Sequence, residues 1–332
     1  MKAIILAVSL LLPLSFYSVV SAQLSRITVG YGSTSTNHFP AWMAKELGIF
    51  RVNGLDVQLV YFRGGTTAMM ALLSRETPIS EIAGPSVVSA SLRGTDVVLI
   101  AGGIVTSDQS LVSRPDIKTA EQLKGGSVAT SIFGGSSDFL ARMAFKKLGL
   151  TPVKDVAIVQ IGGVPERLGA LEKGKVQAAM LGMNEALEVQ KRGFNVLVVV
   201  DQPYQGSGVT TTRRFIRESP DIVRRYVKSQ IESVHRIKTD RETAKKVLVK
   251  YMGMSPQDKE LLEKRYEYAS ADDRLPPKQY PTLEGIKNIL DSLAETDPKA
   301  KSAKPVDFVD IRFIKELDES GFIDELYRGR KR

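Results

Sequence analysis

The sequence predicts an α/β protein built from two lobes, and three observations support this prediction. Segments that alternate like strands and segments spaced like amphipathic helices follow one another along residues 26–101. The same succession starts again near residue 114 and ends near residue 204. The length of 332 residues suits two domains rather than one. Strands and helices that alternate in this way indicate sheets rich in parallel strands, with helices on their faces.

The first lobe is predicted to begin with a strand at 26–31, where β-branched residues alternate with others. A polar loop follows, and Pro40 then suits the first turn of a helix. Residues 97–101 are all apolar, as expected for a strand buried on both faces. Between them we expect strands at 55–60 and 79–83, and helices opened by 64–67 and 84–86.

The second lobe is predicted as a continuous insert, residues 114–204, because the pattern restarts at Pro115 and ends near Pro203. We expect strands at 127–130, 156–161, 176–180 and 196–200, and helices at 119–123, 139–148, 167–173 and 185–192. The first lobe then comprises 23–113 together with 205–332.

From residue 212 onward the pattern is helical only. The predicted helices of this C-terminal extension are 214–237, 242–252, 256–269 and 283–293. The basic end, 328–332, is expected to be solvated, although a basic tail also suits anionic lipid.

The first 22 residues have the features of a secretory signal peptide. Lys2 precedes an apolar stretch of about 14 residues, which is short of the roughly 20 needed to span a bilayer. Val20 and Ala22 are the small residues required for cleavage before Gln23. We therefore expect an exported, periplasmic protein whose mature chain begins at Gln23, and an uncleaved membrane anchor is the alternative.

Composition excludes several kinds of site. The chain has no cysteine, so thiol nucleophiles, disulfides and cysteine-held metal clusters are impossible. Its two histidines, His38 and His235, are far apart in sequence, so we expect no histidine metal site and no cofactor. The net charge of +9 favours anionic partners, but export separates the protein from chromosomal DNA, so no nucleic-acid partner is expected.

Several predicted strand-to-helix turns are rich in Gly, Ser and Thr. Such turns gather at the carboxyl ends of the strands, and helix starts present free N–H groups that bind anions. Capping would explain any one turn by itself, but several aligned in two lobes predict a pocket. We expect it to be lined by Ser35, Thr36, Asn37, His38, Gly65, Thr66, Pro85, Ser86, Gly134, Gly135, Ser136 and Ser137.

Three further side chains are weaker candidates for ligand binding. Trp42 suits core packing, or a wall for an apolar part of the ligand. Arg63 and Arg167 border glycine-rich turns, where each arginine could be an ordinary surface residue or could pair with an anionic ligand.

The sequence contains no Gly-Lys-Ser/Thr phosphate loop, no dinucleotide fingerprint and no Gly-x-Ser-x-Gly elbow. No catalytic residue is therefore predicted.

A family resemblance rests on a series of blocks. Residues 48–50 (Gly-Ile-Phe) and 52–57 (Val-Asn-Gly-Leu-Asp-Val) resemble a signature of the ABC-transporter substrate-binding proteins for nitrate, sulfonates, taurine and thiamine precursors. Further blocks agree in order and spacing: 64–66, 71–72, 90–94, 117–125, 148–150 and 170–174. Asp often follows two of the short strands in this family, whereas this chain has Ser80 or Glu81 and Gln177 there.

The resemblance implies a type II periplasmic-binding-protein fold and a function in capture. The protein would bind a small organic molecule, expected to be anionic, between its lobes and present it to an ABC permease in the inner membrane, acting as a monomer. A ligand-binding sensor for a membrane receptor would use the same pocket and is the alternative. A third hypothesis is an exported hydrolase. It is disfavoured because His38 is the only histidine near the predicted loops that could act as a catalytic base.

Overall fold

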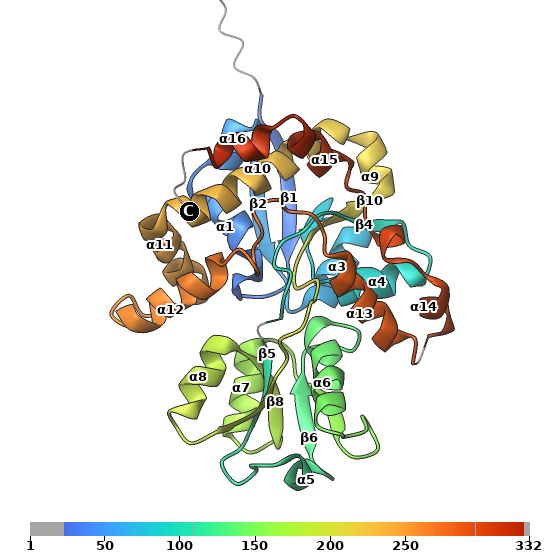
Figure 1. Cartoon of the computed structure of the whole chain (residues 1–332), viewed down its shortest axis with the longest axis vertical. Coiled ribbons are helices and arrows are strands. Elements are labelled where there is room, and N and C mark those ends of the chain that lie inside the picture. Colours follow the sequence, from blue (N-terminus) through green and yellow to red (C-terminus); the bar gives the residue numbers. More distant parts are fainter. Residues whose placement is uncertain (1–22, 108, 296, 329–332) are drawn as a thin grey trace, which may run out of the picture.

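The computed structural model of the chain describes residues 23–107, 109–295 and 297–328 and has two lobes, one above the other in Figure 1. The predicted signal peptide (1–22) and residues 329–332 of the basic end lie outside the described residues. No helix of the described part is long and apolar enough to cross a membrane.

The first sheet has the strand order β2-β1-β3-β10-β4. Its strands are β1 (Ser25–Tyr31), β2 (Leu55–Tyr61), β3 (Ile79–Glu81), β4 (Val97–Ala101) and β10 (Val209–Thr212). Strand β1 pairs in parallel with β2 and β3, so a short 3₁₀ turn (Thr36–His38) with α1 (Phe39–Glu46), and α3 (Gly65–Leu73), start near one edge of the sheet. The short α2 (Ile49–Val52) follows α1 and leads into β2. Helix α4 (Gly84–Leu92) follows β3 at that same edge.

The second sheet has the order β7-β6-β8-β5-β9. Its strands are β5 (Gln109–Ser113), β6 (Ser127–Thr130), β7 (Ala157–Gln160), β8 (Ala178–Gly182) and β9 (Asn195–Val199). Its helices are α5 (Ala120–Leu123), α6 (Ser136–Lys147), α7 (Val164–Glu172) and α8 (Met183–Gln190). The predicted boundary at residue 114 follows β5, so the strands of this lobe begin before that boundary.

Two strands were not predicted from the sequence, and both adjoin the connections between the lobes. Strand β10 lies antiparallel between β3 and β4, and β5 lies antiparallel between β8 and β9. The sheets are therefore mixed, with one antiparallel strand each, and have the two-lobed α/β architecture that the sequence predicted. Strand β10 reads Val-Thr-Thr-Thr, and its position between two other strands buries Thr210 and Thr211.

The C-terminal region is helical, with two corrections to the predicted elements. It comprises α9 (Arg213–Glu218), α10 (Pro220–Thr239), α11 (Arg241–Met252), α12 (Lys259–Ser270), α13 (Leu283–Leu293), α14 (Pro298–Ser302), a 3₁₀ turn (Pro305–Phe308), α15 (Arg312–Glu319) and α16 (Phe322–Leu326). The single helix predicted at 214–237 is wrong, because Pro220 starts a new helix instead of continuing one. The helix predicted from residue 256 starts at Lys259, where Asp258 caps the N–H of Leu261.

The hydrophobic core joins the lobes as well as filling them. Helix α10 covers one face of the first sheet, where Tyr226 stacks on Phe50 with ring centroids 5.2 Å apart. Another cluster reaches from α4 and α13 into the second lobe, where Phe139 of α6 stacks on Tyr204 at 5.5 Å. The lobes are thus packed together on the side of α4, α6 and α13 (Figure 1).

Replacing Gly102 by alanine is expected to lower the free energy of unfolding by about 1–3 kcal/mol. A β-carbon at residue 102 would lie 2.5 Å from the carbonyl oxygen of Tyr280, and backbone cannot move aside cheaply. Gly169 of α7 is the matched control, since a β-carbon there meets nothing within 4 Å. Alanine at 169 is expected to raise stability by about 0.5–1 kcal/mol through helix propensity. Urea unfolding measures both, and equal effects would contradict the predicted close approach.

Candidate functional site

A cavity lies between the lobes at the carboxyl ends of β1, β3, β6 and β8. The first lobe contributes the turn after β1, the ends of β2 and β3, the start of α3 and Gly206. The second contributes residues after β6, β7 and β8, together with Gln109 at the start of β5. The described residues that line it are Gly32, Ser33, Thr34, Ser35, Asn37, His38, Tyr61, Gly64, Gly65, Glu81, Ile82, Ala83, Gln109, Ser131, Ser136, Ser137, Gly163, Val164, Arg167, Gly182, Glu185 and Gly206.

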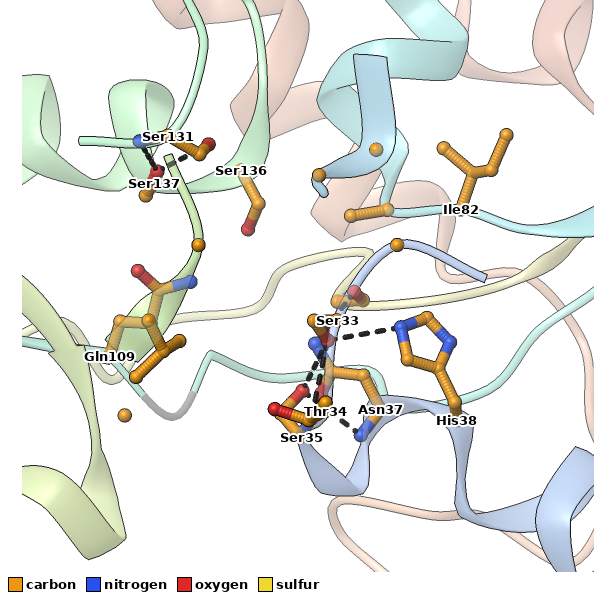
Figure 2. A pocket seen from close by; sticks show the side chains of 18 of the residues that line it. Ser33, Thr34, Ser35, Asn37, His38, Ile82, Gln109, Ser131, Ser136 and Ser137 are labelled. Atoms are coloured by element: carbon orange, nitrogen blue, oxygen red, sulfur yellow. Dashed lines mark hydrogen bonds between the residues drawn. The ribbon is translucent and has the colours of Figure 1, made fainter. Parts of the chain in front are cut away.

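The turn after β1 is held together by its own side chains. The hydroxyl of Ser33 lies 2.9 Å from that of Ser35 and 3.0 Å from Nε2 of His38. The Asn37 side-chain amide donates to the Gly206 carbonyl at 3.1 Å, which ties the turn to the segment entering β10. Figure 2 shows these side chains gathered on one wall of the cavity.

His38 is uncharged in this environment. It is 3% exposed and packs among the rings of Tyr31 and Trp42, at centroid distances of 5.5 and 6.2 Å. Burial lowers the pKa of His38 to about 3, since charging the ring here would leave the cation without solvent. The wall formed by this turn is therefore polar but carries no positive charge at neutral pH.

Serine hydroxyls form much of the opposite wall. The Ser137 hydroxyl accepts from the backbone N–H of Ser131 at 2.7 Å, which fixes the loop between β6 and α6. Ser136 and Tyr204 share a hydrogen bond of 2.7 Å between their hydroxyls. Gln109 extends its amide from the same side in Figure 2. Hydroxyls both donate and accept, so this wall suits ligands of either polarity.

Arg167 is buried in the second lobe and serves two backbone carbonyls. Its Nε donates to Met180 at 2.8 Å and its Nη1 donates to Gly162 at 2.7 Å. Burial lowers the pKa of Arg167 to about 10, while the nearby Glu185 opposes the shift, so the guanidinium keeps its charge at pH 7. Arg167 thus links β8 to the loop before α7, and it lines the cavity at the same time.

Glu81 is a fully buried carboxyl group at the end of β3. The Tyr226 hydroxyl donates to its Oε1 at 2.9 Å, and Oε2 has no partner among the described residues. Burial raises the pKa of Glu81 to about 7, while the tyrosine hydrogen bond opposes the shift. Glu81 therefore changes its charge near neutral pH.

The two lobes also meet at the rim of the cavity. Arg63 at the start of the β2–α3 turn and Glu166 in the first turn of α7 form an ion pair at 3.6 Å. Both side chains are exposed, so the pair adds little to stability. It does mark a place where the lobes touch across the cleft.

The structure distributes the predicted site residues over several places. Seven of them line the cavity: Ser35, Asn37, His38, Gly65, Ser136, Ser137 and Arg167. Thr36, Thr66, Ser86 and Gly135 are outside its lining, although a β-carbon at Gly135 would come within 3.5 Å of the Thr66 hydroxyl. Pro85 and Gly134 line a different groove between α4, α6 and α13. Trp42 is fully buried and stacks on Tyr251 with centroids 5.0 Å apart, and Arg63 is on the rim.

Sequence reasoning did not single out Tyr61, Glu81, Gln109, Glu185 or Gly206 as site residues. Glu81 was noted only as a departure from a family pattern. Gln109 and Gly206 adjoin β5 and β10, the two strands that the pattern did not reveal, so no sequence signal pointed to them. Tyr61 directly follows the strand predicted at 55–60, and that position was the available clue.

Two lobes with a cavity at the carboxyl ends of their strands define the class: this is the periplasmic-binding-protein fold. The particular family follows from a family model described as NMT1/THI5 like, which matches residues 35–244. The chain belongs to this family.

Solved structures support the fold. The periplasmic nitrate-binding protein NrtA of Synechocystis PCC 6803 superimposes with a TM-score of 0.70 at 16% identity, over 93% of this chain and 89% of NrtA. The periplasmic aliphatic sulphonate-binding protein SsuA of Escherichia coli superimposes with a TM-score of 0.64 at 19% identity, over 86% of this chain and 97% of SsuA.

Among curated proteins, the chain is 23% identical over 214 residues to YtlA of Bacillus subtilis, which is named as a binding protein. That match spans 62% of this chain and 64% of YtlA, less than two thirds of the relative.

Among the described residues, no group of three or more His, Asp or Glu side chains could hold a metal ion. The side chains that line the cavity offer hydroxyls, amides, two carboxyl groups, one guanidinium and the imidazole of His38.

Replacing His38 by glutamine is expected to change how stability depends on pH. Between pH 6.5 and 3 the unfolded wild-type chain binds a proton at His38 that the folded protein does not, so wild-type stability falls with falling pH relative to the variant. The difference should grow by up to about 1.4 kcal/mol per pH unit below 6.5 and stay constant above pH 7.5. Urea unfolding across this range tests it, and a constant difference down to pH 4 would show that His38 is charged in the folded protein.

Proposed function

We propose that this protein is an exported solute-binding protein that captures a small organic molecule between its two lobes and delivers it to an ABC importer. The observation that carries the proposal is the cavity itself, because both lobes supply its walls. A ligand bound there contacts the second lobe fully only when the lobes are together. Binding is therefore coupled to closure, which lets a membrane partner distinguish loaded from empty protein.

The comparisons support this function in outline. NrtA and SsuA are named for binding nitrate and aliphatic sulphonates in the periplasm, and they share the fold. The predicted signal peptide supports export to the same compartment. We propose the permease in the inner membrane as partner, and a protein that acts as a monomer and not as an enzyme.

The test is closure of the lobes in response to a ligand, measured by small-angle scattering with a library of small polar molecules. A binding molecule should reduce the radius of gyration saturably. Ser136→Phe should abolish the response, because Ser136 faces the cavity and a phenyl ring would fill it (Figure 2). Ser302→Phe, on an exposed position of α14, is the matched control and should respond like the wild type.

The ATPase activity of a reconstituted permease provides the second measurement. Stimulation by loaded protein supports delivery to an importer. Closure without stimulation of any permease from the same genome would favour the sensor function instead.

A further inference from the structure

The two crossings between the lobes lie against a segment of the C-terminal region. The first crossing follows β4 and is described at 102–107, and the second, 200–208, leads from β9 to β10. Both run through the junction of the lobes (Figure 1). They pair with each other, since the N–H of Gly206 donates to the Ile104 carbonyl at 2.8 Å. The segment between α12 and α13, residues 271–282, is called the hinge strap below, because it bonds to both crossings.

The hinge strap fixes the first crossing through backbone hydrogen bonds. The N–H of Gly102 donates to the Gln279 carbonyl at 2.7 Å, and the N–H of Val105 donates to the Arg274 carbonyl at 2.8 Å. Two bonds three residues apart hold this part of the crossing in one orientation to the first lobe.

The second crossing is fixed to the first lobe as well. The side-chain oxygen of Gln205 accepts the N–H of Thr282 at 2.8 Å, and its backbone carbonyl accepts the N–H of Gly84 at 2.8 Å. The N–H of Ile82 donates to the Gly208 carbonyl at 3.0 Å. The half of this crossing next to β10 therefore belongs to the first lobe.

The crossings leave the first lobe near Ser107 and Pro203. Thr106 and Pro203 form a β-bridge between the crossings, and beyond it the two chains run to β5 and β9 of the second lobe. A rotation of the second lobe against the first must therefore change the backbone torsions near these residues.

Side chains of the C-terminal region bind a backbone carbonyl at each of these two points. The Tyr268 hydroxyl donates to the Ser107 carbonyl at 3.3 Å, and Nη1 of Arg274 donates to the same carbonyl at 3.2 Å. The Arg274 guanidinium also stacks on the Tyr268 ring, 3.5 Å from its centroid. At the other crossing, the Asn288 amide of α13 donates to the Pro203 carbonyl at 2.8 Å.

These bonds are made while the lobes touch each other. Arg63 and Glu166 pair across the cleft, and Lys146 of α6 pairs with Glu295 beyond the end of α13 at 3.5 Å. Bonds that exist in one arrangement of the lobes and not in another shift the equilibrium toward the arrangement that makes them.

We propose that the C-terminal region controls the opening of the lobes: Tyr268 and Arg274 at the first crossing, and Asn288 at the second, hold the pivot carbonyls in the closed arrangement, and opening releases them. The proposal rests on the function proposed above in requiring that the lobes open and close. Its test needs no ligand.

The natural chain has no cysteine, so introduced cysteines report on the lobes alone. Met70→Cys in α3 and Lys173→Cys just after α7 place nitroxide labels at exposed positions, one in each lobe, and electron–electron resonance gives the open and closed populations of the mature protein. Where the open form dominates, the rate of disulfide formation between Thr66→Cys and Gly135→Cys measures the closed fraction. A β-carbon at Gly135 lies 3.5 Å from the Thr66 hydroxyl, so these cysteines meet only when the lobes are together.

We expect Tyr268→Phe and Asn288→Ala each to raise the ratio of open to closed protein by about two- to tenfold, the equilibrium equivalent of one net hydrogen bond. Because the two side chains act on different crossings, the effects should multiply in the double variant.

Tyr266→Phe is the matched control. Tyr266 lies on the same helix, and its hydroxyl also donates to a backbone carbonyl, that of Ile237 at 3.0 Å, which touches neither crossing. This variant should keep the wild-type ratio of open to closed protein. Its Tm should fall at least as far as that of Tyr268→Phe, so a general loss of stability is separated from release of the pivot.

A ratio of open to closed protein in Tyr268→Phe and Asn288→Ala equal to that of the control would overturn the proposal. A shift of either variant toward the closed form would also overturn it. Neither result bears on the solute-binding function, which fails only if no small molecule closes the lobes in the scattering experiment.

Discussion

Replacing Trp42 by alanine is expected to lower the free energy of unfolding by about 3–5 kcal/mol, the largest stability effect that we predict for a single substitution. The indole projects from α1 and is fully buried, stacked on Tyr251 of α11 and edge-on to Tyr31 at 6.0 Å. Its removal leaves a cavity that rigid helices on both sides cannot close. Unfolding in guanidinium chloride, followed by circular dichroism, measures the loss.

Trp42→Phe separates the two roles considered for this residue. Phenylalanine preserves most of the packing and should cost less than half as much as alanine. Because Trp42 is absent from the lining of the cavity, ligand affinity should change less than twofold in the phenylalanine variant. A tenfold loss of affinity in a stably folded Trp42→Phe protein would show that the ring contacts the ligand after all.

Replacing Arg167 by leucine is expected to lower the free energy of unfolding by about 2–4 kcal/mol, because the Gly162 and Met180 carbonyls lose charged donors inside the second lobe. The carboxyl group of Glu185, one of the charges near the guanidinium, would also lose a compensating cation. Thermal unfolding of the intact protein detects the change as a fall in Tm.

Arg63→Leu is the control for this prediction. Like Arg167, Arg63 lies next to a glycine-rich turn at the cleft between the lobes, but its side chain is 76% exposed. Its removal should change stability by less than about 0.5 kcal/mol. Similar losses in the two variants would contradict the assignment of Arg167 as a structural cation.

The sequence predicted most elements of the α/β units because each carries a local signal. The alternating strands predicted at 26–31 and 55–60, and the helix starts predicted at 64–67 and 84–86, need only near neighbours in the chain to be recognised. The turn at Ser35–His38 was predicted in the same way, since a polar segment between a strand and a helix is a local pattern. The prediction of one helix at 214–237 missed the break at Pro220, where one helix has ended and the next begins.

The remainder of the site could not be predicted from local patterns. Strands β5 and β10 are short, partly polar and antiparallel to their neighbours, and they become strands only through pairing with segments up to about 130 residues away in the chain. The positions of Gln109 and Gly206 depend on them. The partner of Glu81 is Tyr226, 145 residues further on, so neither its burial nor its raised pKa has a sequence signature.

By itself, then, the sequence determined the two-lobed α/β class, the turns that supply one wall of the cavity and the family to which the chain is similar. Tertiary structure decided which side chains face the cavity and how they are charged. The physical reason is that secondary structure follows from interactions over a few residues, whereas desolvation and hydrogen bonding of a buried group depend on everything packed around it. Thus His38 loses its charge among aromatic rings and Arg167 is engaged by backbone carbonyls. The charges that line the cavity are set by those contacts and not by the net charge of the chain.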